Sequence, residues 1–160
     1  DLLDKGVIQK SCSQWASPLV LVKKTDGTTR MCVDYRRLNE VTKSDAYPVP
    51  RIDSLLEAVK GYSYYTALDL RAGFHQVCLV PEDVPKTAFV CPVGLFEFRR
   101  LPFGLKNAPS TFQRMMESVL GPLYVKGVRV YIDDILCFSK TWEEHQECLR
   151  AVIIRPPVVR

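Results

Sequence analysis

Several absences bound what this 160-residue chain can be. Its apolar runs are short and broken by charge, so no stretch of about 20 apolar residues could cross a bilayer as a helix. The first residues lack the basic region and apolar core of a signal peptide. Internal repeats and low-complexity tracts are also missing. With 47% hydrophobic and 25% charged residues, the composition predicts an ordinary globular domain with its own core and no membrane partner.

Patterns for zinc sites and disulfide frameworks are scarce as well. None of the six cysteines forms a Cys-x-x-Cys pair, and only His75 and His145 could complete a zinc site. We interpret the cysteines as reduced thiols of a reducing compartment, several of them acting as small apolar residues. The net charge of +4 permits a nucleic-acid partner without requiring one, because 22 basic and 18 acidic residues can simply be interspersed.

Alternating strand and helix signals predict an α+β fold with a mainly antiparallel sheet packed on helices. Asp26-Gly27 between two apolar runs is a strong hairpin signal, and Pro92-Val93-Gly94 marks a second turn. The expected elements are hairpins over 19–35 and 87–101, strands over 64–70 and 74–80, and helices over 52–59, 112–120 and 142–152. The Phe and Met residues on one face of the second helix are most simply core packing.

Two adjacent acids, Asp133 and Asp134, lie between apolar, β-prone runs in the stretch 128–138. This pattern predicts a hairpin with both carboxylates at its turn. Alone, the pair is most simply a surface turn, because Asp is a common turn residue. Asp69 ends the strand predicted over 64–70, where a lone acid needs hydrogen-bond partners or a metal. If these strands are neighbours, three carboxylates converge, and two Mg²⁺ ions would relieve their repulsion.

The first hairpin carries basic residues around its tip, namely Lys23, Lys24 and Arg30, and Arg36 and Arg37 follow it. One interpretation is a solvated hairpin whose lysines block edge pairing. The other is a cationic finger that grips phosphates.

Four ordered motifs connect these features. Tyr131-Ile132-Asp133-Asp134 resembles the Tyr-x-Asp-Asp box of reverse transcriptases, and the segments 33–39, 67–76 and 101–109 resemble further family motifs in the family's order. The similarity is strongest to the pol polyproteins of gypsy-type LTR retrotransposons, relatives of the retroviruses, and it covers roughly residues 1–150. It implies a right-hand polymerase fold.

The resemblance also implies a domain layout for this single, partial reverse transcriptase domain. Residues 1–48 and about 75–105 would be finger-like, and 49–74 and 106–150 palm-like. We expect 151–160 to be an aberrant tail, with the thumb, RNase H and integrase of the family absent from this fragment.

Residue roles follow from the same resemblance. The catalytic, metal-binding acids would be Asp69, Asp133 and Asp134, and the carbonyl of Leu70 would be a further metal ligand. The nucleotide-binding residues would be Lys24, Arg30, Ala72, Gly73, Phe74, Phe103 and Gly104, with Lys23 competing with Lys24 for the lysine role. The Phe74 ring would exclude a ribose 2′-hydroxyl and so favour dNTPs. Tyr131 and Ile132 would contact the primer end.

The implied activity is RNA-directed DNA polymerase: template-directed deoxynucleotidyl transfer to a primer 3′-hydroxyl with two Mg²⁺ ions, for which Mn²⁺ can substitute. The implied partners are an RNA or DNA template with its primer, dNTPs and the remainder of the pol polyprotein. The expected location is intracellular, in the cytoplasm or in retroelement particles.

Two alternatives stay open. The chain could be an inactive or domesticated remnant that binds nucleic acid or proteins, or another two-metal nucleotidyltransferase or nuclease. Phe74 and the cationic hairpin disfavour the latter. We expect the fragment alone to bind metal but to polymerise poorly, which robust, Asp133-dependent primer extension would contradict.

Overall fold

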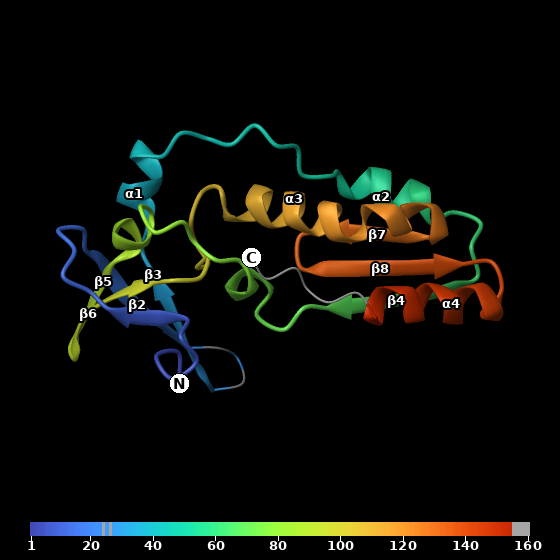
Figure 1. The fold of residues 1–160 in the computed structure, drawn as a ribbon. Helices are drawn as coiled ribbons and strands as arrows, with labels where there is room; N and C mark the ends of the chain where they lie inside the picture. The colour runs from blue at the N-terminus through green and yellow to red at the C-terminus, as the bar shows by residue number, and fades with distance from the viewer. Residues whose placement is uncertain (24, 26, 155–160) are drawn as a thin grey trace. The chain divides into compact units, whose positions relative to one another are not determined.

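The protein is described by a computed structural model that covers residues 1–23, 25 and 27–154. Its strands are β1 (Ile8–Lys10), β2 (Ser17–Lys23), β3 (Thr29–Val33), β4 (Tyr64–Asp69), β5 (Phe89–Cys91), β6 (Gly94–Phe98), β7 (Val128–Tyr131) and β8 (Asp134–Ser139) (Figure 1). The α-helices are α1 (Arg36–Val41), α2 (Ile52–Ala58), α3 (Ala108–Leu120) and α4 (Trp142–Ile153), and the 3₁₀ helices are η1 (Gly73–Gln76), η2 (Val84–Thr87) and η3 (Gly121–Lys126).

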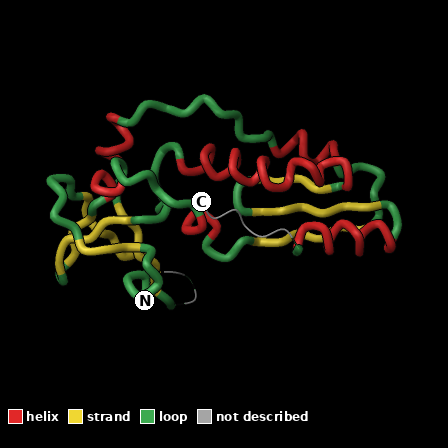
Figure 2. Tube along the Cα trace, in the orientation of Figure 1, coloured by secondary structure: helices red, strands yellow, loops and turns green. Residues whose placement is uncertain are grey.

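The chain divides into two compact units. Unit 1 comprises Asp1–Ser44 and Phe74–Ala108, and unit 2 comprises Asp45–Gly73 together with the chain from Pro109 onward, described as far as Ile154. Residues 42–51, which form no regular structure, lead from one unit into the other (Figure 2).

Unit 1 is built on a five-stranded sheet in the order β1-β6-β5-β2-β3. The predicted hairpins are confirmed as the antiparallel pairs β2–β3 and β5–β6, whereas β2 and β5 run parallel. The core of this unit gathers around Val7, Phe89 and Phe98. Tyr35, which is only 2% exposed, donates from its hydroxyl to the carbonyl of Thr87 at 2.8 Å and so anchors the start of α1.

Unit 2 contains the three-stranded antiparallel sheet β4-β8-β7, and α4 lies alongside β4 and β8 (Figure 1). The predicted helices over 112–120 and 142–152 are confirmed as α3 and α4. A capping box starts α4: the hydroxyl of Thr141 accepts from the amide of Glu144, whose carboxylate accepts from the amide of Thr141. The core includes Phe112, Phe138 and Val130, each at most 2% exposed.

The strand predicted over 74–80 is wrong. The chain forms η1 there, and only an isolated bridge joins Cys78 to Arg100. A short apolar run fits a strand and a buried helical turn equally well. Here the chain turns at Ala72, whose φ is +53°, and the helical turn follows directly. The α+β class itself is confirmed by these elements. Of the predicted tail, residues 151–153 belong to α4 and 155–160 lie outside the described residues.

The composition also raised the questions of disulfide bonds and of membrane-spanning helices. All six cysteines are free thiols, and Cys137 and Cys148 are buried in unit 2. None of the described helices has the length and apolar character that a membrane span needs.

Candidate active site

The acidic hairpin is formed by β7 and β8, which pair Tyr131 with Asp134 across a two-residue loop of Ile132 and Asp133. Ile132 has φ of +53°. A two-residue loop with positive φ at its first central residue is the type II′ pattern, which favours glycine at that position. A β-branched residue in this conformation is strained by roughly 1–2 kcal/mol. The tip of the hairpin therefore carries Ile132 in a conformation that is energetically unfavourable for it.

Asp69 reaches the same hairpin through strand pairing. β4 runs antiparallel to β8, and the Cα partner of Asp69 is Asp134. One residue further on, the amide of Leu70 donates to the carbonyl of Asp133 at 3.3 Å. The condition set by the sequence, that these strands be neighbours, is thus met, and the three acids lie at one end of the sheet of unit 2.

Asp133 has the most unusual environment of the three acids. Its Oδ1 atom is buried and has no hydrogen-bond partner among the described residues. Burial, and then the charges of Asp69 and Asp134, raise the pKa of the Asp133 carboxyl above its ordinary value. Asp69 and Asp134 are themselves exposed. A buried carboxylate oxygen without a donor, beside two further carboxylates, is suited to a bound cation.

The side chains do not already form a complete metal cage. Within the described part of the chain, no group of three or more His, Cys, Asp and Glu side chains is arranged to hold an ion. Strand pairing nevertheless brings the three acids to the same end of the sheet.

The backbone of Gly73 closes one side of Asp133. A Cβ atom added to Gly73 would lie 2.8 Å from Oδ1 of Asp133 and 2.9 Å from Cζ of Phe112. Both distances are shorter than Cβ contacts in folded proteins, so a larger residue at position 73 would force a neighbouring side chain to shift. The preceding residue, Ala72, is exposed and has the positive φ that turns the chain at this point.

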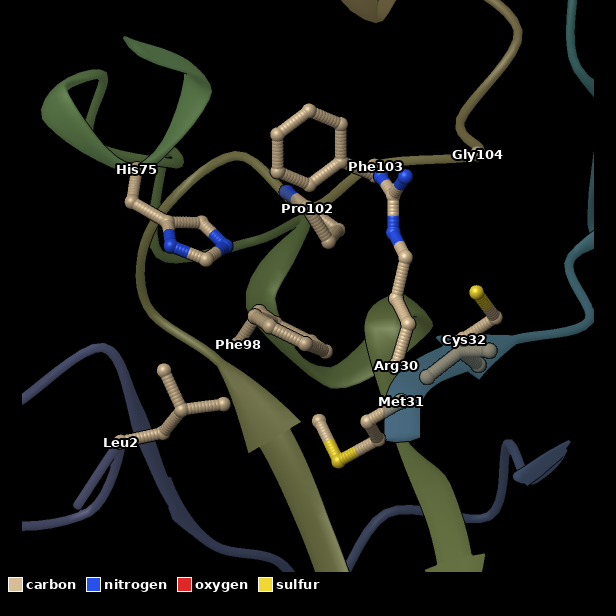
Figure 3. A pocket seen from close by; sticks show the side chains of 10 residues that line it. Leu2, Arg30, Met31, Cys32, His75, Phe98, Pro102, Phe103 and Gly104 are labelled. Carbon is tan, nitrogen blue, oxygen red and sulfur yellow. The ribbon is translucent and has the colours of Figure 1, made fainter. Parts of the chain in front are cut away.

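The other predicted nucleotide-binding residues belong to unit 1. A cavity of about 390 Å³ is lined there by residues that include Arg30, Phe103, Gly104 and His75. Figure 3 shows Arg30 extending toward the Phe103 ring from one side, with His75 on the other. The guanidinium carbon of Arg30 lies 5.3 Å from the centre of that ring, a cation–π distance.

Phe74 and His75 complete this aromatic group. The Phe74 ring packs 4.8 Å from Phe103 and is only 6% exposed. His75 packs edge-on against Phe103 at 5.6 Å, and burial lowers the pKa of its imidazole. In unit 1 the structure thus brings together Arg30, Phe74 and Phe103, whereas the acids, Ala72, Gly73, Tyr131 and Ile132 belong to unit 2. Lys24 lies outside the described residues, and Lys23 is an exposed residue at the end of β2.

Comparison with known proteins gives the family. Residues 22–155 match the family described as "Reverse transcriptase (RNA-dependent DNA polymerase)". The chain belongs to the reverse transcriptase family. It is 45% identical over 158 residues to the retrovirus-related Pol polyprotein from transposon opus of Drosophila melanogaster, covering 96% of this chain and 16% of that protein. It is 38% identical over 151 residues to the transposon Tf2-3 polyprotein of Schizosaccharomyces pombe, covering 94% and 11%.

Solved structures agree with this assignment. The prototype foamy virus protease-reverse transcriptase superposes with a TM-score of 0.88 at 32% identity, covering 95% of this chain and 20% of that one. The foamy viral enzyme in complex with double-stranded DNA gives the same TM-score at 30% identity, covering 95% and 26%. The resemblance to the reverse transcriptases of retrotransposon Pol polyproteins is confirmed. This reverse transcriptase chain spans only a small part of the polyproteins that it matches.

Two residues that position the reverse transcriptase motifs were missed by the sequence reasoning. Asn39 donates from Nδ2 to the carbonyl of Gly104 and accepts from the amide of Lys106, both at 2.8 Å, so it fixes the loop around Phe103. Gln113 is fully buried on α3, inside the stripe that was interpreted as core packing. In the sequence, a polar glutamine among the apolar residues of this helix could have indicated such a role.

Proposed function

We propose that this chain supplies the nucleotide-transfer centre of an RNA-directed DNA polymerase, which adds deoxynucleotides to a primer 3′-hydroxyl. The observation that carries the proposal is the pairing of Asp69 with Asp134 beside the buried oxygen of Asp133, which has no hydrogen-bond partner in the described part of the chain. Ionising three neighbouring carboxylates is unfavourable without a counter-charge, so the arrangement makes sense as a cation site.

The donor set fits divalent cations that prefer oxygen ligands. Asp69, Asp133 and Asp134 would hold two Mg²⁺ ions, with Mn²⁺ as a substitute and the Leu70 carbonyl as a backbone ligand. When bound, the ions would lower the pKa of the primer hydroxyl and neutralise charge on the phosphates. The protein's own part is placement: β4 and β8 set the spacing of two acids, and the strained hairpin sets the third.

Unit 1 would bind the incoming nucleotide. The Arg30 guanidinium, already ordered against Phe103, presents a planar cation for the triphosphate, together with Lys24 or Lys23. Phe74 would exclude a 2′-hydroxyl, and Phe103 and Gly104 would border the base. In unit 2, the backbone at Ala72 and Gly73 would bind phosphate groups. Tyr131 and Ile132 would face the primer end.

The nucleic-acid partners are proposed from the structural relatives. Foamy viral protease-reverse transcriptases have been solved in complex with double-stranded DNA and with an RNA/DNA hybrid. We propose the same classes of template and primer here, with unit 1 as fingers and unit 2 as palm, and the rest of a gypsy-type pol polyprotein as the partner that completes the enzyme inside the cell.

Primer extension tests this function. A polyprotein that carries this chain is given an RNA template, a DNA primer, dNTPs and Mg²⁺, and Asp133→Asn is compared with Asp53→Asn, an exposed acid on α2. Because metal-held charge stabilisation is worth several kcal/mol, Asp133→Asn should lose roughly 100-fold or more in rate. The Asp53 variant should match the parent. Equal rates for the two variants would refute the proposal in favour of an inactive or binding-only module.

A further inference from the structure

Gln113 makes an unusually complete set of hydrogen bonds for a side chain on the buried face of α3. It is 0% exposed. Its Oε1 atom accepts from the amide of Ile132 at 2.8 Å, and its Nε2 atom donates to the carbonyl of Val130 at 3.2 Å and to Glu117 at 2.7 Å. Both donor hydrogens and the acceptor of this amide are used. Two of the three partners are backbone groups of the acidic hairpin.

The partner Ile132 is the strained residue of that hairpin. Its φ of +53° suits glycine, and a β-branched side chain makes the conformation more costly. Strained backbone persists where the surroundings hold it. The amide of Ile132 lies inside the two-residue loop, and the hydrogen bond from it to Gln113 is the contact that ties the loop to α3.

Gln113 is fixed in turn from its other side. One carboxylate oxygen of Glu117 accepts from Gln113, and the other accepts from the Tyr47 hydroxyl at 2.5 Å. Tyr47 is held by its neighbours, because Arg114 lies 4.7 Å over its ring and pairs with Asp45. The hydrogen bond to Glu117 also raises the pKa of the Tyr47 hydroxyl. The contacts form a continuous path from the segment before α2 to the acidic hairpin.

We infer that Gln113 is a positioning residue of the active site: its amide holds Ile132 at its positive φ and thereby sets the position of Asp133, while Glu117 and Tyr47 hold Gln113. The inference rests on the proposed function for its catalytic meaning. The structural part stands separately, because the position of Asp133 is reported by a backbone contact, the Leu70 amide on the Asp133 carbonyl at 3.3 Å.

Core filling alone does not account for Gln113. Phe112 and Met116 fill the core beside it with apolar side chains. A leucine would occupy similar space but would remove the partners of the Ile132 amide and the Val130 carbonyl. Leaving buried backbone groups without partners is unfavourable. The amide is therefore explained by the hairpin that it binds.

Hydrogen exchange at single amides of the full 160-residue chain tests the inference without any catalytic readout. In Gln113→Leu, the amides of Ile132 and Leu70 should exchange about tenfold faster, the effect of losing roughly one hydrogen bond, while the Cys137 amide in β8 stays protected. The matched control is Gln146→Leu, an exposed glutamine on α4, which should leave all three amides unchanged. Tyr47→Phe, at the outer end of the path, should give a smaller change in the same direction.

A rescue variant separates positioning from general packing. Glycine adopts positive φ without strain, so Gln113→Leu combined with Ile132→Gly should restore the protection of the Leu70 amide. Mn²⁺ binding is followed in parallel and should weaken in Gln113→Leu and recover in the double variant. Unchanged Leu70 exchange in both Gln113→Leu and Tyr47→Phe, or no rescue by Ile132→Gly, would overturn the inference. Absence of Mn²⁺ binding by the parent chain would instead count against the proposed function.

Discussion

Replacing Gly73 by alanine is the sharpest structural perturbation of the candidate site. The added Cβ would meet Oδ1 of Asp133 at 2.8 Å, Cζ of Phe112 at 2.9 Å and Cβ of Leu70 at 3.4 Å. Phe112 is 0% exposed and has little freedom to move aside. The carboxylate of Asp133 is the group that must shift, so the substitution acts directly on the proposed metal ligand.

The size of the effect follows from packing. Adding a methyl group to a filled site costs about 1–3 kcal/mol. The loss of glycine's freedom in the unfolded chain offsets about 0.4–1 kcal/mol of this, since the φ of Gly73 is not positive and alanine can adopt it. A net loss of roughly 1–2 kcal/mol lowers the midpoint of thermal unfolding by roughly 2–8 °C in a chain of this length.

Thermal unfolding in EDTA measures that loss, and Mn²⁺ titration measures the displacement of Asp133. Gly121→Ala is the matched control, because its added Cβ would have nothing within 4 Å and its φ is not positive. The control should unfold at the parent temperature or slightly above it. If Gly73→Ala melts within about 1 °C of the parent, less than the expected effect of 1 kcal/mol, and binds Mn²⁺ equally well, the close approach to Asp133 is refuted.

Two further substitutions test the surroundings of the site. The pKa of the Asp133 carboxyl is higher in the folded chain than the value of about 3.8 in the unfolded chain. The folded state is therefore most favoured when this carboxyl is protonated, and it loses stability as the pH rises through the raised pKa. In metal-free buffer at pH 7, Asp133→Asn should therefore raise the melting temperature by roughly 2–4 °C for each kcal/mol of destabilisation that it removes. This gain should shrink toward pH 4. A gain that grows on acidification would contradict the raised pKa. Gly127→Ala places a Cβ 2.0 Å from the Phe138 carbonyl oxygen at a φ of +79°, and a urea titration should show unit 2 destabilised by more than about 3 kcal/mol. Gly61→Ala is the control: its φ is +80° but its added Cβ meets open space, so it should lose only about 1–2 kcal/mol.

Much of the site could be predicted because its motifs are local in sequence. Asp133 and Asp134 share one hairpin whose apolar flanks and acidic turn are visible in eleven residues. Their meeting with Asp69 depended on pairing between β4 and β8, which no local pattern specifies. Sequence periodicity predicts the apolar face of α3. It does not reveal the role of Gln113, because the hairpin groups that bind the Gln113 amide lie on another element.

The prediction failed or was incomplete where several structures fit a short apolar run. Residues 74–80 follow a turn at Ala72, and an alanine gives no sequence signal of a positive φ. The sequence therefore predicts a strand where the structure has η1. The short strand β1 and the parallel pairing of β2 with β5 depend on contacts between distant segments. Tertiary contacts settle such segments, and propensity alone does not.

We propose that Asp69, Asp133 and Asp134 together bind divalent cations. Mn²⁺ titration of the full chain, followed by electron paramagnetic resonance of the free ion, tests it most directly. We expect Mn²⁺ to bind and Mg²⁺ to displace it. The Mn²⁺ affinity should fall at least about tenfold in Asp133→Asn, which loses one ligand, and should be unchanged in Asp53→Asn. Identical titration curves for the parent, Asp133→Asn and Asp53→Asn would contradict it.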